Sequence, residues 1–150
     1  GGFGDVTPGN ATASGLNLKF TVEVNPAYVA LGYRLKDLGL VFNGSASGAG
    51  SFARVDEDVF EPPLAGALLA SLDVFAPGTV ADMQDFHDFT PIYYTKWRVD
   101  KTATFFAASP GDTAGASFIR QSFSQVIIPA PGTAALLGMA GVVLGGRRRR

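Results

Sequence analysis

The chain has 150 residues, which fits one domain of ordinary size, and 47% of them are apolar, which excludes a fully disordered chain. Four of its 12 basic residues are the last four, so residues 1–146 carry 8 positive and 13 negative charges. An acidic body argues against a nucleic-acid partner, because phosphate binding needs a basic face. Cysteine is absent, which excludes disulfides, thiolate zinc sites and thiol nucleophiles.

The first 15 residues, GGFGDVTPGNATASG, predict a flexible lead-in, because they are mostly small and polar. The first residue is Gly1 rather than Met, which indicates a processed product or a fragment.

Residues 16–128 have the pattern of β-strands separated by turns. Apolar and polar residues alternate strictly over 16–24 and alternate again over 93–105, and a period of two is typical of half-buried strands. The second of these runs is expected to be the longest strand. The remaining strands are expected over 29–42, 52–60 and 116–128.

Turn signals divide these strands from one another. They are Asn25-Pro26, Asn43-Gly44, Pro62-Pro63 and Ser109-Pro110-Gly111-Asp112. Residues 64–75 are ambiguous, because they could begin as a short helix but end like a strand. Residues 78–91 are expected to be a polar connection. Five to seven strands of this kind predict an all-β fold, an antiparallel β-sandwich of the Greek-key or jelly-roll type.

The C-terminal segment 129–150 differs from the body in composition and in the distribution of its charges. Two prolines interrupt the chain after the last strand, and 14 uncharged residues over 133–146 follow. As a helix these would span about 21 Å, shorter than the hydrocarbon core of a bilayer, but cationic side chains at a helix end can reach the interface. A membrane anchor is predicted, consisting of Leu136, Leu137, Val142, Val143, Leu144, Arg147, Arg148, Arg149 and Arg150. A buried core helix with a basic end is the alternative.

This three-part tail resembles the PEP-CTERM sorting signal of exported bacterial proteins. The motif residues are Pro129, Ala130 and Pro131 with the hydroxyl residue Thr133, and the apolar helix and the Arg cluster follow them. Ala130 stands where the family has Glu, which indicates a variant subclass.

The resemblance implies an exported protein of the cell surface or the extracellular, exopolysaccharide-associated matrix. It implies an exosortase-type protease as partner, transient anchoring in the inner membrane through the C-terminal helix, and an N-terminal signal peptide. No catalytic activity is expected on this interpretation, and no cofactor is required. Fold and sorting do not fix the role of the body, so its association with polymer rests on the resemblance alone.

Candidate chemistry in the body is sparse. Asp82, Asp85 and Asp88 recur at every third residue and could share one side of a helical turn, and hard oxygen ligands of this kind suit Ca²⁺. His87 is the only histidine, so a catalytic triad could be built only around it. A solvated acidic loop is the alternative to both.

Two further clusters have alternative explanations. Tyr93, Tyr94 and Trp97 could form an aromatic platform for sugar rings, with Tyr93 and Trp97 on one face and Tyr94 on the other. Core packing is the alternative for Trp97. Asp56, Glu57, Asp58 and Glu61 form an acidic patch that could supply the paired carboxylates of a glycoside hydrolase; the alternative is that Asp56 and Asp58 face solvent on one side of a strand.

Three functions therefore remain open at this stage. The main expectation is a structural surface or matrix protein, which needs no pocket. The alternatives are a carbohydrate- or Ca²⁺-binding module and a secreted hydrolase.

Overall fold

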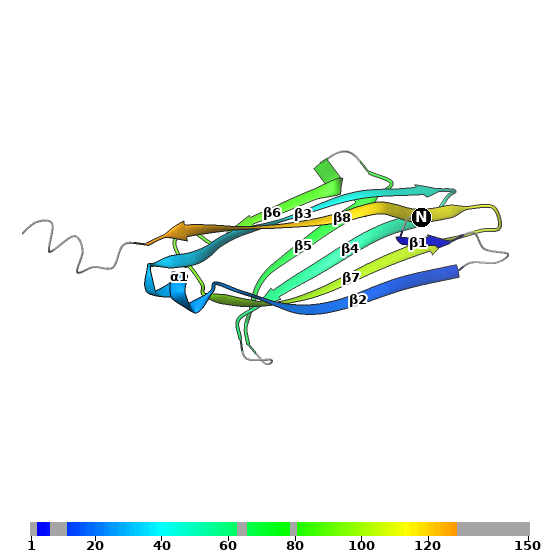
Figure 1. The fold of residues 1–150 in the computed structure, drawn as a ribbon. Helices are drawn as coiled ribbons and strands as arrows, with labels where there is room; N and C mark the ends of the chain where they lie inside the picture. Colours follow the sequence, from blue (N-terminus) through cyan, green and yellow to red (C-terminus); the bar gives the residue numbers. More distant parts are fainter. Residues whose placement is uncertain (1–2, 7–11, 63–65, 79–80, 129–150) are drawn as a thin grey trace, which may run out of the picture.

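The computed structural model describes residues 3–6, 12–62, 66–78 and 81–128. Within these ranges the chain forms mostly antiparallel β-strands in two four-stranded sheets (Figure 1). The elements are β1 Phe3–Val6, β2 Thr12–Glu23, α1 Pro26–Ala30, β3 Tyr33–Ser47, β4 Phe52–Phe60, β5 Leu68–Ala76, the 3-10 turn η1 Ala81–Met83, β6 Gln84–Asp88, β7 Lys96–Ala107 and β8 Thr113–Ile127. The prediction of an all-β antiparallel fold is confirmed.

The strand order is β1-β8-β3-β6 in one sheet and β2-β7-β4-β5 in the other. The two sheets form two layers, and their inner faces pack on one hydrophobic core (Figure 1). Every second residue of β7 is buried, from Trp97 to Ala107, because successive side chains of a strand point to opposite faces. The largest fully buried apolar side chains are Trp97, Phe42, Phe105, Leu35, Leu38 and Leu40.

The strand expected over 29–42 begins later than predicted. Val29 lies in α1, and β3 starts only at Tyr33. Asn25 caps this helix, since its Oδ1 accepts a hydrogen bond from Ala27 N at 3.0 Å, and Pro26 supplies a suitable φ angle at the first helical position. The apolar alternation was therefore a wrong guide here, because local capping outweighed it.

The turn predicted at Asn43-Gly44 is also wrong, because β3 continues through it to Ser47. The register with β8 shifts between these two residues, so Gly44 marks an irregularity within the strand. A side chain at Gly44 would overlap the buried ring of Phe42, which explains the glycine. The chain reverses instead at Gly48 and Gly50, where φ is 95° and 84°.

Two other segments and the identity of the longest strand differ from expectation, and the structure resolves one ambiguous segment. The predicted lead-in contains β1 and the first residues of β2, and the predicted polar connection contains η1 and β6. The ambiguous segment 64–75 is strand β5 from Leu68 onward. The longest strands are β3 and β8, at 15 residues each, rather than β7, which has 12.

Gly44→Ala is expected to lower the free energy of unfolding by about 2 kcal/mol, because the new methyl group must displace a packed ring. Urea denaturation followed by tryptophan fluorescence measures this, since Trp97 is the single tryptophan. Gly39→Ala is the matched control within β3, because its methyl group would meet the hydroxyl of Ser122, which can rotate away. Equal losses in the two variants would contradict this account of Gly44.

Candidate functional site

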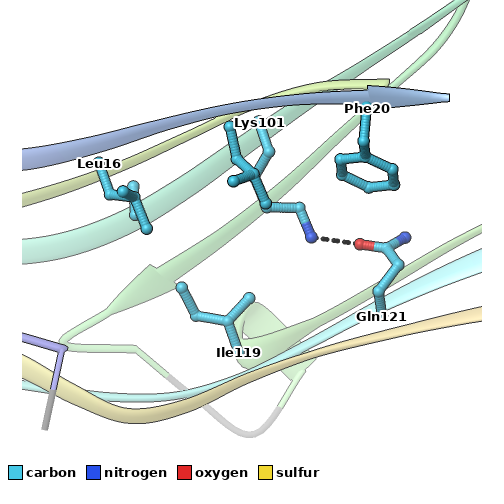
Figure 2. Close-up of a pocket in the computed structure, with 7 residues that line it drawn as sticks. Leu16, Phe20, Lys101, Ile119 and Gln121 are labelled. Atoms are coloured by element: carbon cyan, nitrogen blue, oxygen red, sulfur yellow. Dashed lines mark hydrogen bonds between the residues drawn. The ribbon is translucent and has the colours of Figure 1, made fainter. Parts of the chain in front are cut away.

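A groove of about 360 Å³ lies between β2 of one sheet and β8 of the other. Figure 2 shows Leu16 and Phe20 extending from β2 toward Ile119 and Gln121 on the opposite layer. The lining is apolar except for Gln121 and Lys101, which stands opposite Leu18 in the pairing of β2 with β7. The lining residues are Leu16, Leu18, Phe20, Lys101, Ala103, Ile119 and Gln121.

The groove exists because the two sheets are open along this side. β2 is an outer strand of its sheet, and β1 pairs with β8 only around Ala114 and Ala116. Leu16 and Leu18 consequently remain 46% and 48% exposed although they belong to the inward face of β2. The alternation predicted over 16–24 is confirmed as a strand, but full burial is reached only at Val24.

The opposite side of the two sheets is closed. There β5 and β6 pack against each other, and the backbone N of Asp73 donates a hydrogen bond of 3.0 Å to Oδ2 of Asp85. A carboxylate thus occupies a backbone donor of an outer strand, which blocks strand addition at that point. The two long sides of the molecule therefore differ: one is sealed, and one presents apolar side chains.

A buried polar group, Glu57–Lys101–Gln121, contributes Lys101 and Gln121 to the lining of the groove. Glu57 on β4 and Lys101 on β7 are direct cross-strand neighbours. Both residues are buried, with exposed fractions of 0% for Glu57 and 7% for Lys101. Lys101 Nζ lies 2.8 Å from Glu57 Oε2, with the geometry of an ion pair rather than of an aligned hydrogen bond. Gln121 on β8 completes the group, because its Nε2 donates to Glu57 Oε1 at 2.8 Å and its Oε1 accepts from Lys101 Nζ (Figure 2).

This group connects the two sheets at the point where the groove would otherwise weaken the packing. Two ions taken out of water lose several kcal/mol of solvation each, and their attraction compensates only when further hydrogen bonds satisfy them. Gln121 supplies one donor and one acceptor for that purpose from the other sheet. The arrangement has no net charge, so it can orient a neighbouring polar atom but does not attract an ion.

The sequence prediction missed this group. Glu57 was assigned to an acidic patch in which only Asp56 and Asp58 were expected to face solvent, and its burial against Lys101 was not predicted. Asp56, on the outer face, pairs with Arg54 at 2.6 Å. The signal was present in the alternation, because Glu57 shares its face with Val55 and Val59. Lys101 likewise shares its face with the buried residues of β7.

The aromatic residues predicted as a sugar platform do not lie together on a surface. Trp97 is fully buried, with its ring centroid 4.7 Å from that of Phe89. Tyr94 lies on the same side as Trp97, at 6.2 Å between centroids, because β7 begins only at Lys96 and the expected alternation does not extend to Tyr94. Burial, with the charge of Glu61 as a second cause, raises the pKa of Tyr94.

The three aspartates predicted as Ca²⁺ ligands do not share one side of a helix. Asp82 lies in η1, and Asp85 and Asp88 lie in β6, where residues three apart point to opposite faces. Asp85 accepts the hydrogen bond from Asp73 described above, and Asp88 Oδ2 lies 3.5 Å from Lys36 Nζ. Among the described residues no group of three or more acidic or histidine side chains could hold a metal ion.

His87 packs against an aromatic side chain. Its ring lies 4.5 Å from that of Phe89 in an edge-to-face arrangement, and the backbone of His87 pairs with that of Leu38.

The residues of the predicted sorting motif and membrane anchor, over 129–150, lie outside the described residues. Within the described part of the chain, no helix has both the length and the apolar character needed to cross a membrane.

No protein-family model matches this chain, and no curated protein and no solved structure is significantly similar to it. The groove and the Glu57–Lys101–Gln121 group are therefore the features of the described residues from which a binding role can be argued.

Lys101→Met alone is expected to lower the free energy of unfolding by about 3 kcal/mol, because it leaves the Glu57 carboxylate buried without its partner. The double variant Lys101→Met, Glu57→Leu is expected to recover at least half of that loss, since no buried charge remains. Urea denaturation of the single and double variants measures the difference.

Lys19→Met is the matched control on the neighbouring strand, because the Lys19 side chain is largely exposed and its pair with Asp100 is worth less than about 1 kcal/mol. A double variant as unstable as the sum of its single variants would show that Glu57 and Lys101 do not act as a pair.

The Asp88 carboxyl is expected to titrate below the usual range for aspartate. The hydroxyl and the backbone N–H of Thr90 both donate to Asp88 Oδ1, and these bonds, followed by the charge of Lys36, lower its pKa. A pKa lowered by folding contributes stability above the ordinary aspartate pKa, and this contribution is lost as the pH falls. NMR titration of Asp88 in Thr90→Ala should show the pKa moving upward; an unchanged midpoint would refute the assigned cause.

Proposed function

We propose that this chain is an exported, non-catalytic protein of the cell surface or extracellular matrix, sorted through its C-terminal segment. The observation that carries the proposal is the position at which strand β8 ends. β8 ends at Ile127, and Ile128 N donates a hydrogen bond of 2.9 Å to Gly32 O. The motif begins at the next residue, Pro129, so cleavage near Pro131–Thr133 would leave every described strand intact.

The sorting mechanism follows from the chemistry of the tail. The apolar residues 133–146 would form a helix that halts export in the inner membrane, and the four arginines would keep their end on the cytoplasmic side. The prolines before the helix would hold the backbone extended and accessible to an exosortase-type protease. The body would then be released or displayed outside the membrane.

The proposed fold type is a jelly-roll β-sandwich. Support comes from the strand order, in which β1-β8-β3-β6 faces β2-β7-β4-β5 and the chain crosses between the sheets at all but one of its connections. Such a double-sheet arrangement suits a stable extracellular module. Association with exopolysaccharide is part of the proposal through the resemblance of the tail alone.

A non-catalytic role is supported by the state of the polar side chains at the groove. Glu57, Lys101 and Gln121 bond to one another, and the remaining lining is aliphatic or aromatic. A general base or a nucleophile requires a side chain that is free to reach a substrate. The groove therefore suits binding more than bond cleavage.

The mass of the protein recovered from the envelope and medium of its host tests the sorting proposal. A product ending near Pro131–Thr133 is expected, because the protease would remove the helix and the arginines. Replacing all four residues Arg147 to Arg150 by Ser should reduce the processed fraction several-fold, since the orientation signal is lost. Arg120→Ser, an exposed change on β8, should be processed normally. A product that still ends at Arg150 would overturn the proposal.

A further inference from the structure

The outer edge of β2 is long and regular. β2 pairs with β7 through twelve consecutive residue pairs, from Thr12 to Glu23, without a register shift. Since β2 is the first strand of its sheet, its other edge has no strand partner among the described residues and presents backbone N–H and C=O groups for pairing. Such an edge is a template for pairing with another chain unless a bulge, a proline or an inward-pointing charge prevents it.

β2 carries none of these protections over its apolar half. It has no proline and no bulge, and its single lysine, Lys19, belongs to the outer face, where it pairs with Asp100 at 3.1 Å. The inward side chains are Leu16, Leu18 and Phe20, which line the groove. The far side of the molecule, in contrast, has the Asp85 carboxylate on a backbone donor of β5.

We propose that β2 pairs antiparallel with β2 of a second copy of this chain, which joins the two β2-β7-β4-β5 sheets into one continuous sheet. The pairing uses the same surface on both copies, as a two-fold symmetric dimer requires. It supplies partners for the backbone groups of both edges and brings the exposed leucines of the two grooves together. The occupant of this side of the groove is thus the second copy itself.

The charge pattern of β2 excludes one register, and the exposed leucines favour another. With Leu18 facing its counterpart on the two-fold axis, Leu16 lies opposite Phe20 and Asn17 opposite Lys19, so that no like charges meet. Placing Lys19 on the axis would set two ammonium groups directly opposite each other, which is destabilising. The Leu18-centred register also buries the most exposed part of the groove lining.

The Glu57–Lys101–Gln121 group preorganises the surface on which this pairing takes place. It ties β4 and β7 to β8 beneath the leucines, so the groove has its shape before a second copy arrives. A preformed surface lowers the ordering cost of association. The inference rests on the groove and not on the C-terminal segment, so it stands or falls independently of the sorting proposal.

Analytical ultracentrifugation of the full chain over a concentration series tests the dimer. The unmodified chain is expected to form a dimer, and Leu18→Lys is expected to weaken dimerisation about tenfold or more, because an inward-pointing lysine opposes edge pairing. Leu16→Lys serves the same purpose if Leu18→Lys does not fold. Phe86→Lys is the matched control, because Phe86 on β6 is 61% exposed but lies away from the groove, and it should leave the dimer unchanged.

A crosslinking experiment tests the register. The chain has no cysteine, so Leu18→Cys introduces a single thiol, which should join two copies through a short thiol-specific crosslinker. Phe86→Cys should give no such product. A chain that is monomeric at all concentrations, a dimer that survives both lysine variants, or a dimer in which position 18 does not crosslink would overturn the proposal.

Discussion

The ion pair between Glu57 and Lys101, held by Gln121, is the constraint on which the open side of the molecule depends. A two-layer β fold is stable when its inner faces exclude water, yet here one long side is bordered by half-exposed leucines. The group replaces part of the missing apolar contact with a polar connection between the layers. It also fixes the relative position of β7 and β8, which a purely aliphatic contact of the same size would specify less strictly.

The two long sides show how one architecture handles its unpaired edges in different ways. Along β5 and β6 the edge is short and a side-chain carboxylate occupies a backbone donor. Along β2 the edge is long, and its only lysine points to the outer face. The contrast within one chain favours the β2 side as an interaction surface, since a side chain that blocks a strand edge is present elsewhere in the same fold.

Much of the β architecture was predictable from the sequence, because the alternation of apolar residues is a local property of each strand. The span of β4, Phe52–Phe60, and the turn at Ser109–Asp112, where Asp112 N donates to Ser109 O at 3.0 Å, agree with the prediction. Errors arose where a single local bond outweighed the pattern, as at the Asn25 cap of α1, or where a glycine served packing against Phe42 rather than a turn. The Glu57–Lys101–Gln121 group was not predicted, because Glu57 lies beside Lys101 only through the register of β4 with β7. A local sequence pattern does not contain that register.

The end of β8 has a mechanical consequence. β8 pairs with β3 along almost its whole length, from Thr113 opposite Ser47 to Ile127 opposite Tyr33. Tension applied through the residues that follow Ile128 would pull along the axis of β8 and load this ladder in shear, so that many hydrogen bonds would have to yield together. A strand peeled from its edge would instead lose its bonds one at a time. A module tethered at this point would resist a pulling force far better than one tethered through a short outer strand such as β6.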